Sequence, residues 1–380
     1  MSEGLGSARS RKVILAGTIG NVLEWYDFAI YGYFAVSIGR HFFPHEDPVA
    51  QLLATFGVFA VGYLARPAGG VIVGHIGDRY GRRAALTFSV AAMAIPTFLI
   101  GILPGYSTAG IYAPIALTAL RVMQGLSVGG EYPCSMVFLI EGAGQERRGL
   151  IGAFACLGAV CGILFGSAVG AVLASMMSTE TLEAWGWRIP FLVGLLVGLA
   201  GLWVRKHVLE MAPAEPTGRA PIVETLREHG WLVARFAALT AFSVVPFHVM
   251  FVYIVSWLQI ADGIPPATAL EINTISMIIL LPVIIAAGWA SDRYGRKPFL
   301  LIAMILGFFG AVPLFWIMLQ PGLALLGQLG FVLIIGVYIA VHPALLVETA
   351  PPQVRCTAVA LGYNLCAAVF GGLTALTATW

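Results

Sequence analysis

Charged side chains are scarce in this sequence of 380 residues. Asp, Glu, Lys and Arg together make up 11% of it, whereas hydrophobic residues make up 59% and the mean hydropathy is +0.89. A soluble domain carries about 25% charged residues, so this chain has too little polar surface to cover a soluble globule. The same numbers exclude a disordered chain, and a net charge of +2 gives no sign of nucleic-acid binding. The composition argues against a cytosolic enzyme and indicates a membrane protein.

Motifs for metal binding or catalysis are also lacking. The five cysteines lie in apolar segments, without the spacing of a zinc site or a disulfide framework, so we interpret them as small buried hydrophobic residues. The run Gly125-Leu-Ser127-Val-Gly129 matches the nucleophile elbow of hydrolases, but it lies inside a long apolar segment rather than at a strand-to-helix turn. We therefore expect no metal, no cofactor and no enzymatic activity.

Long apolar runs are abundant. A membrane-spanning helix needs about 20 mostly apolar residues, and a helix satisfies its backbone hydrogen bonds without water. We therefore predict an all-α membrane protein with eleven spans. They are expected near residues 13–39, 50–74, 84–104, 111–140, 150–176, 187–204, 232–260, 268–290, 298–319, 323–347 and 356–380.

The basic residues predict the orientation of these spans. With the N-terminus in the cytoplasm, 17 of the 21 Lys and Arg residues fall on the inner side and two on the outer side. The other two, Arg66 and Arg121, lie inside spans. Such an excess is the positive-inside pattern of multi-pass proteins. We expect a bacterial inner (plasma) membrane protein with a cytoplasmic N-terminus.

Two charged motifs occur twice. The run Asp-Arg-Tyr-Gly-Arg at residues 78–82 recurs at 292–296, each time after the second span of its part. A Glu followed seven positions later by Arg occurs at Glu141 and Arg148 and again at Glu348 and Arg355, between the fourth and fifth spans. Repeats in register are typical of duplicated transporters. They predict two pseudo-symmetric six-span halves.

These halves predict the domain organisation. Residues 1–204 form the N-terminal half, 205–231 a cytoplasmic central loop and 232–380 the C-terminal half. The second half carries only five of its six expected spans, so we expect a twelfth span to be missing from this polypeptide.

The motifs resemble those of the major facilitator superfamily. The repeated loop, which reads Gly-x-x-x-Asp-Arg-x-Gly-Arg-Arg in its first copy, is the most specific signature of that superfamily. A finer resemblance, to the metabolite:proton symporter family of ketoglutarate, citrate, shikimate and proline/betaine permeases, rests on four segments. They are residues 20–28, the Arg66-Pro67-x-Gly69-Gly70 run, residues 121–132 and residues 185–191.

The resemblance implies a major facilitator fold and proton-coupled symport of a small carboxylate-bearing metabolite by alternating access. An antiporter or uniporter of the same superfamily is the alternative, and an intramembrane enzyme lacks a nucleophile–base set. The partners implied are the metabolite, protons and the lipid bilayer. We expect no nucleic acid and a monomer.

Ionisable residues inside the first and fourth spans are the candidates for proton coupling. Such residues are costly in a membrane and usually functional. Glu24 and Asp27 share one face of the first span, and Arg121 and Glu131 share one face of the fourth. Burial favours a protonated carboxylate and a nearby guanidinium favours the ionised one, so an Asp27–Arg121 pair that forms and breaks could bind and release a proton. A static ion pair that fixes helix packing is the alternative.

The predicted substrate site draws on polar residues within the spans. Either Arg121 or Arg66 could hold a carboxylate. The alternative for Arg121 is that it merely balances Asp27, and the alternative for Arg66 is that it braces the helix at Pro67. His248 could bind substrate or serve packing. The predicted substrate-binding set is Arg121, Arg66, Asn21, Gln124, Tyr31, His248 and Asn364.

The repeated charged motifs are predicted to latch one state of alternating access, as the resemblance implies. Basic loops orient helices in any case, but orientation alone does not require an acid, so Asp78 favours the latch. The predicted gating set is Asp78, Arg79, Arg82, Arg83, Glu141, Arg148, Asp292, Arg296, Glu348 and Arg355.

Overall fold

A computed structural model describes residues 2–43, 48–206, 220–254, 257–258, 264 and 266–371. These residues are almost entirely helical, and no strand occurs among them. The first helices are α1 (Ser2–Tyr33), α2 (Ala35–Phe42), α3 (Pro48–Tyr80), α4 (Arg82–Ile102), α5 (Tyr106–Ala109), α6 (Tyr112–Glu141), η1 (Gln145–Arg147), α7 (Arg148–Met176), α8 (Thr179–Ala184), η2 (Gly186–Arg188) and α9 (Ile189–Lys206). The others are α10 (Pro221–Glu228), α11 (Gly230–His248), η3 (Val249–Tyr253), α13 (Pro266–Tyr294), α14 (Arg296–Met318), α15 (Ala324–Thr349), η4 (Pro352–Val354), α16 (Arg355–Cys366) and η5 (Ala367–Gly371).

Eight of the described helices are long and apolar enough to cross a membrane. They are the segments Leu53–Tyr80, Arg82–Ile102, Gln145–Met176, Gly186–Lys206, Gly230–Phe251, Thr268–Tyr294, Arg296–Met318 and Ala324–Thr349. The three other predicted spans fall on α1 with α2, on α6, and on α16 with η5. Both α1 and α6 carry the buried polar residues discussed below, and residues 372–380 of the eleventh predicted span lie outside the described residues.

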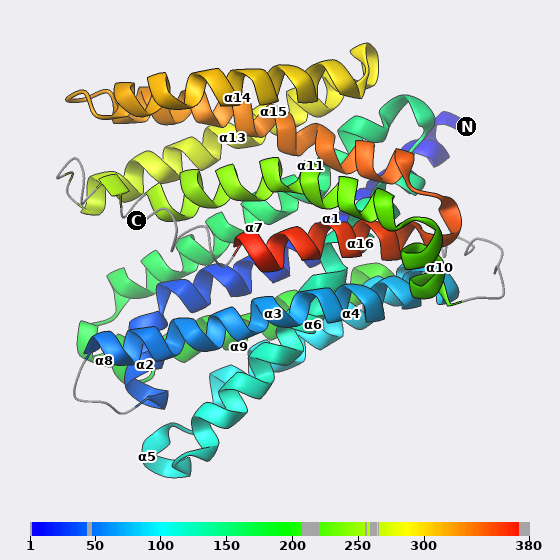
Figure 1. Ribbon diagram of the computed structural model, residues 1–380. Helices are drawn as coiled ribbons and strands as arrows, with labels where there is room; N and C mark the ends of the chain where they lie inside the picture. Colours follow the sequence, from blue (N-terminus) through cyan, green and yellow to red (C-terminus); the bar gives the residue numbers. More distant parts are fainter. Residues whose placement is uncertain are drawn as a thin grey trace.

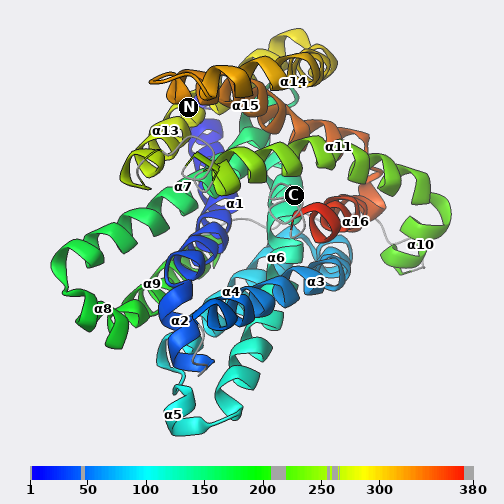
Figure 2. The same ribbon diagram turned by 60° about the vertical axis from the view of Figure 1, so that its left-hand side comes forward.

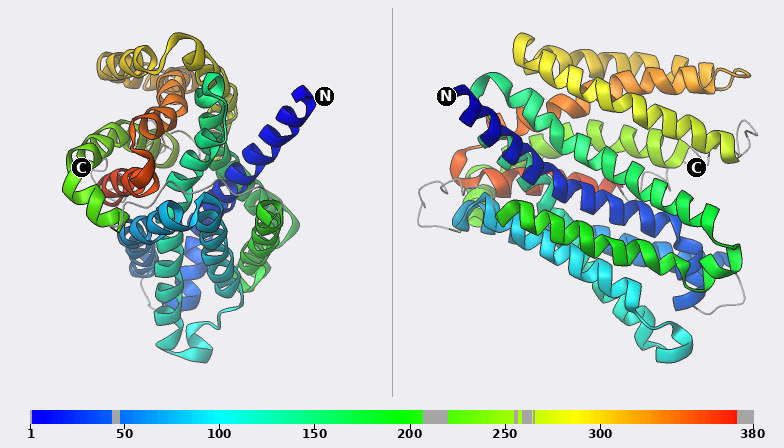
Figure 3. Two further views of the ribbon diagram at one scale, coloured as in Figure 1. Left: turned by 90° about the vertical axis from the view of Figure 1, so that its right-hand side faces the viewer. Right: turned by 180° about the vertical axis from the view of Figure 1, so that it is seen from behind.

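The long helices run side by side in one elongated bundle (Figure 1). One group holds α1 to α9, in which α3 packs on α6, α4 on α9 and α1 on α7 (Figure 3, right). The other group holds α10 to η5, in which α13 and α14 pack on α15 and α11 packs on α16. The groups meet where α16 packs on α3 and α13 packs on α7; Figure 2 shows α16 between α11 and α3. This is the predicted all-α membrane architecture.

Glycines allow the closest helix approaches. A Cβ atom on Gly125 of α6 would lie 2.0 Å from the backbone oxygen of Gly62 in α3, and one on Gly129 would lie 2.0 Å from that of Arg66. In α7, a Cβ on Gly162 would lie 2.5 Å from the backbone oxygen of Val22 in α1. Real side chains do not fit at such distances, so these positions serve helix packing. The run around Ser127 is therefore a packing seam inside a helix, as the sequence predicts.

Several boundaries differ from the predicted ones. The first helix begins at Ser2 and is interrupted at Phe34, and α9 extends to Lys206, two residues beyond the predicted first half. The predicted central loop contains α10, while residues 207–219 lie outside the described part. Hydropathy marks where a chain is apolar, whereas helices continue through polar turns at either end of a span.

Candidate functional site

The two copies of the repeated loop lie at one end of the bundle, together with the N-terminus (right-hand side of Figure 1). We call it the motif end. Each copy is a sharp turn between two helices, at Gly81 between α3 and α4 and at Gly295 between α13 and α14. These glycines have φ values of 102° and 89°, which other residues rarely adopt. The shared Gly is therefore a requirement of the turn.

Asp78 joins the two groups of helices. Its Oδ1 accepts a hydrogen bond from the backbone N–H of Cys356 at 3.0 Å, and its Oδ2 accepts from the backbone N–H and the hydroxyl of Thr357 at 2.9 and 2.7 Å. Both residues lie in the first turn of α16, whose unpaired amide groups attract an anion. The predicted gating acid thus holds a helix of the opposite group.

Arg82 extends this contact. Its guanidinium donates to Asp78 at 2.8 Å and to Glu141 at 3.0 Å, and also to the backbone oxygen of Pro352 at 3.3 Å. Glu141, at the end of α6, in turn accepts a hydrogen bond from Arg355 of α16 at 2.7 Å. The first copy is therefore a network, buried at Asp78 and Arg82 and partly exposed at Glu141 and Arg355, that crosses from one group of helices to the other.

The second copy builds a similar junction in the opposite direction. Asp292 accepts hydrogen bonds from the backbone N–H groups of Gly149 and Leu150, in the first turn of α7, at 2.7 and 2.8 Å. Arg296 pairs with Asp292 at 2.8 Å and with Glu348 at 3.0 Å. Asp292 therefore holds α7 as Asp78 holds α16.

Three other predicted gating residues take different positions. Arg148 forms no ion pair among the described residues, and its buried Nε atom has no hydrogen-bond partner. Arg79 is exposed, and Arg83 donates to the backbone oxygen of Lys206 at 2.9 Å. The carboxylate of Glu141 is instead occupied by Arg82 and Arg355.

A second polar cluster is buried between α1, α4 and α6. The carboxylate of Asp27, which is fully buried, accepts hydrogen bonds from Arg121 at 2.7 Å, Gln124 at 2.8 Å and Thr97 at 2.9 Å. Arg121 also lies over the ring of Tyr31, with 3.5 Å between Cζ and the ring centroid. The structure thus brings together four predicted residues, Asp27 and Tyr31 of the first span and Arg121 and Gln124 of the fourth.

This cluster is incompletely satisfied. The Nε and Nη2 atoms of Arg121 and the Oε1 atom of Gln124 are buried and have no hydrogen-bond partner within the described chain. Glu24, one turn before Asp27, has an unpartnered Oε2 atom as well. Unpaired buried polar atoms are costly, so the cluster has the chemistry of a site that receives a further group.

Glu131 lies in a separate ion pair. Arg205 at the end of α9 donates to its carboxylate, and Ser89 of α4 does so too. Gly20 of α1 makes room for the pair, because a Cβ atom there would overlap both side chains. The assignment of Arg205 to the cytoplasmic loop is wrong, since the residue is only 1% exposed. A basic residue at the end of an apolar run does not reveal whether it turns inward.

Asn21 and Asn364 are predicted substrate residues that hold helices together. Asn21 donates from α1 to Ser135 at 2.9 Å and to the backbone oxygen of Ala155 at 3.2 Å. Asn364 of α16 donates to the backbone oxygen of Gly129 at 2.5 Å, and its Oδ1 atom has no partner. Neither lines the two cavities described next.

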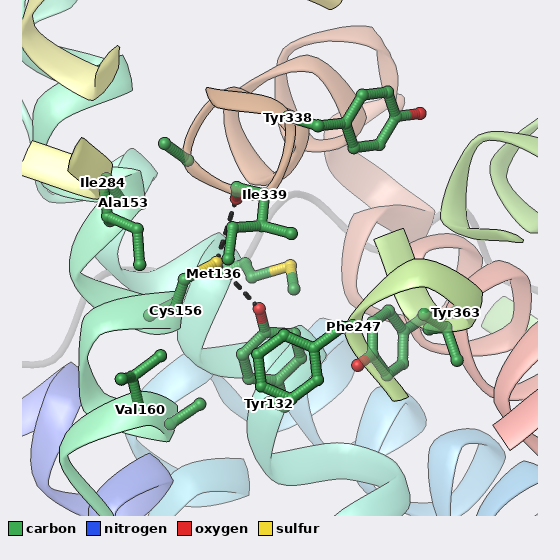
Figure 4. Packing of buried hydrophobic residues seen from close by; sticks show 14 of the residues in the cluster. Tyr132, Met136, Ala153, Cys156, Val160, Phe247, Ile284, Tyr338, Ile339 and Tyr363 are labelled. Carbon is green, nitrogen blue, oxygen red and sulfur yellow. Dashed lines mark hydrogen bonds between the residues drawn. The ribbon is translucent and has the colours of Figure 1, made fainter. Parts of the chain in front are cut away.

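Two cavities lie next to each other inside the bundle. The first is small and is lined by residues of both groups: Trp25, Tyr132, Cys156, Ala159, Val160, Ser243, Val244, Phe247, His248, Ile339 and Tyr363. Figure 4 shows Tyr132, Phe247 and Tyr363 close together there, with Cys156 bonded to Tyr132 and to the backbone oxygen of Ile339. Four of these eleven described residues are Trp, Tyr or Phe, and none of the eleven is acidic.

The second cavity, also small, contains the Asp27 cluster. Its lining is Asp27, Phe28, Phe59, Gly62, Tyr63, Arg66, Met93, Arg121, Gln124, Gly125 and Val128. The ring of Phe28 in this cavity lies 5.6 Å from that of Trp25 in the first. Arg66 stacks on Tyr63, 3.8 Å from the ring centroid, and no ion pair among the described residues includes it. A guanidinium paired with Asp27 and one that forms no ion pair among the described residues thus line one cavity.

Sequence reasoning missed Thr97, Ser89 and Arg205. Thr97 and Ser89 lie in α4, a span with no other signal than its apolar composition, and small hydroxyl residues are common in such helices. Only their position opposite Asp27 and Glu131 distinguishes them. That position depends on the rotation of α4 about its axis, which the spacing within one helix does not determine.

Comparison with known proteins agrees with this architecture. The family described as Major Facilitator Superfamily matches residues 17–375. The glycine betaine/proline/ectoine/pipecolic acid transporter of Dickeya dadantii is 34% identical over 99% of this chain and 78% of its own length. The proline/betaine transporter of Salmonella typhimurium is 32% identical over the same shares.

Solved structures show the same fold. The proton:xylose symporter bound to 6-bromo-6-deoxy-D-glucose has a TM-score of 0.82 at 19% identity, covering 98% of this chain and 88% of that one. The inward open form of the xylose transporter from E. coli has a TM-score of 0.65 at 20% identity, over 96% and 90%. The helix arrangement is thus less similar to the inward open form.

The chain belongs to the major facilitator superfamily. It is a multi-pass membrane protein and a transporter of small molecules rather than an enzyme.

Proposed function

We propose that this chain is a proton-coupled symporter that imports a small zwitterionic solute across a bacterial inner membrane. The observation that carries the proposal is the buried Asp27–Arg121 pair in a cavity adjacent to an aromatic one. The named relatives are transporters of glycine betaine, proline, ectoine and pipecolic acid, all of which join a carboxylate to a cationic nitrogen. This narrows the carboxylate-bearing metabolite expected from sequence to a zwitterion.

The two cavities offer complementary chemistry for such a solute. Aromatic faces attract a cationic nitrogen, and Trp25, Phe247, Tyr132 and Tyr363 supply them in the first cavity. The second cavity supplies guanidinium groups, which pair with a carboxylate. Arg66 is the stronger candidate for first contact because it has no carboxylate partner.

The coupling follows from the charge balance of Asp27 and Arg121. A buried ion pair that loses one partner leaves an uncompensated charge, which costs about 3–5 kcal/mol. Protonation of Asp27 therefore leaves Arg121 in need of another anion, which the carboxylate of the substrate can provide. A proton and a substrate then bind together more favourably than either binds alone.

The latch indicates on which side of the membrane the transporter is closed in the state described here. We assign the motif end to the cytoplasm, because basic residues concentrate there and the N-terminus lies at the same end. With Asp78 holding α16 and Asp292 holding α7, the halves are closed on that side. In our proposal residues 1–204 and 232–380 move against each other, joined by residues 205–231, within a monomer.

Purified protein in liposomes tests the coupling. We expect Asp27→Asn to abolish accumulation driven by a proton gradient and substrate-driven alkalinisation outside, while counterflow of a zwitterion such as proline persists, because exchange needs no net proton movement. Glu146→Gln, at an exposed acid in the loop after α6, is the matched control. Full accumulation by the Asp27→Asn variant at every pH would contradict the proposal, and wild-type transport without alkalinisation would indicate a uniporter.

A further inference from the structure

Two ring nitrogens that belong to lining residues of the first cavity are fully covered and lack a hydrogen bond among the described residues. The hydroxyl of Tyr132 is hydrogen-bonded to the thiol of Cys156, which donates a hydrogen bond to the backbone oxygen of Ile339. The indole Nε1 of Trp25 and the imidazole Nε2 of His248, in contrast, are buried and make no hydrogen bond within the described chain. They add unused hydrogen-bonding capacity to a lining that also holds the hydroxyls of Ser243 and Tyr363.

The backbone fixes what His248 can offer. Its Nδ1 atom lies 2.8 Å from the backbone oxygen of Val244. A carbonyl oxygen only accepts, so Nδ1 carries the hydrogen, and in a neutral ring Nε2 is then a bare acceptor. The cavity lining contains no acid that could balance an imidazolium, and an unpaired buried charge is strongly disfavoured. His248 therefore presents an acceptor that requires a donor.

The local helix geometry keeps the ring in this place. His248 ends α11 two residues after Pro246, and the chain continues as the π-helix η3. A π-helical turn inside a membrane helix is uncommon and is frequent at functional sites. Two polar residues of α11, Ser243 and His248, line the cavity, and the π-helical turn directly follows the second.

The complementary ligand has three properties. It needs an acceptor for the indole N–H of Trp25, a donor for Nε2 of His248, and a cationic centre for the aromatic walls. A carboxylate provides the acceptor, and an ammonium nitrogen that keeps at least one hydrogen provides both donor and cation. A fully N-methylated nitrogen keeps the cation but has no N–H, so it leaves Nε2 buried and unpaired.

We propose that His248 is a specificity-determining residue that selects zwitterions with an N–H group over their fully N-methylated counterparts. This inference rests on the proposed zwitterion transport and adds a ranking within that substrate class. A site built to bond a donor rejects analogues that lack it, so we expect a preference of roughly tenfold or more, which corresponds to ~1.4 kcal/mol.

Matched pairs of solutes test the ranking. Competition for uptake into liposomes is measured for proline against N,N-dimethylproline and for N,N-dimethylglycine against glycine betaine. His248→Met fills a similar volume with only a weak thioether acceptor, and His248→Gln offers an amide oxygen. His229→Met, at the junction of α10 and α11, controls for the loss of a histidine outside the cavity. We expect His248→Met to abolish the preference, and His248→Gln and His229→Met to retain it.

The outcomes separate the inference from the proposed function. Equal competition by both members of each wild-type pair, or better competition by the methylated ones, overturns the role of His248 while zwitterion transport stands. A preference that survives in His248→Met overturns it too. Failure of every zwitterion to compete or to be taken up overturns the proposed function and the inference with it. If His248→Met does not fold, the wild-type pairs and His248→Gln still decide the question.

Discussion

The two copies of the repeated loop form junctions of unequal strength. Asp78 accepts three hydrogen bonds from the first turn of α16, whereas Asp292 accepts two from the first turn of α7. The side chains of Asp78 and Arg82 are 0% and 4% exposed, and those of Asp292 and Arg296 are 8% and 12% exposed. Ion pairs that water reaches contribute less, so the first junction is the stronger one.

The residues that close the two networks account for much of the difference. Arg355, the first residue of α16, crosses to Glu141 and links the two groups of helices a second time. Its counterpart Arg148, the first residue of α7, forms no ion pair among the described residues, and Glu348 pairs with Arg296 alone. Both copies therefore have the acid that holds a helix end, but among the described residues only the first copy has a second link between the groups, from Arg355 to Glu141.

The largest effect is expected from Asp78→Asn. An amide keeps the shape but loses the charge that the helix end and Arg82 both favour, and charge-assisted hydrogen bonds contribute about 1.5–3 kcal/mol each. We expect tenfold or more enrichment of the inward-facing state, and a clearly smaller shift for Asp292→Asn. Labelling rates of single cysteines placed at each end of the cavities measure the shift. Equal shifts in the two variants would show that the junctions are equivalent.

Gly81→Ala and Gly295→Ala test the turns without touching the acids. Both glycines combine positive φ with extended ψ, a region that is essentially restricted to Gly and costs other residues about 1–3 kcal/mol. Because the two turns have similar geometry, we expect similar losses of thermal stability, in contrast to the unequal aspartates. Thermal unfolding in detergent measures this, with Gly144→Ala, at an exposed loop glycine that has open space, as the control. A loss confined to one turn would show that the two copies already differ in their backbone.

The smallest effects are expected at the second crossing. Arg355→Gln removes a partly exposed ion pair to Glu141, for which about 0.2–1 kcal/mol is typical. Arg148→Gln removes no ion pair, so its inward-facing fraction is expected to stay close to that of the wild type. The same labelling experiment applies, and a larger shift for Arg148→Gln than for Arg355→Gln would reverse the assignment.

Much of this architecture is predictable from local sequence, because membrane spans are read from composition over about 20 residues. The repeat of Asp78 at Asp292 indicates the duplication, and the common face of Glu24 and Asp27 indicates a polar interior. What the sequence does not specify is which partner each charge meets across a helix interface. Arg121 and Arg66 look alike within their spans, yet Arg121 is paired with Asp27 and Arg66 forms no ion pair among the described residues.

Asp78 also occupies the place of a helix cap. The N–H groups that it binds belong to the second and third residues of α16, which a side chain just before the helix usually binds. Here the capping group comes from a distant part of the chain, so any separation of α3 from α16 leaves that helix uncapped and its amides to water. A cap contributes typically about 1 kcal/mol. A capping interaction of this size, with its acid on one group of helices and its helix on the other, can form and break in every transport cycle without trapping the carrier in either state.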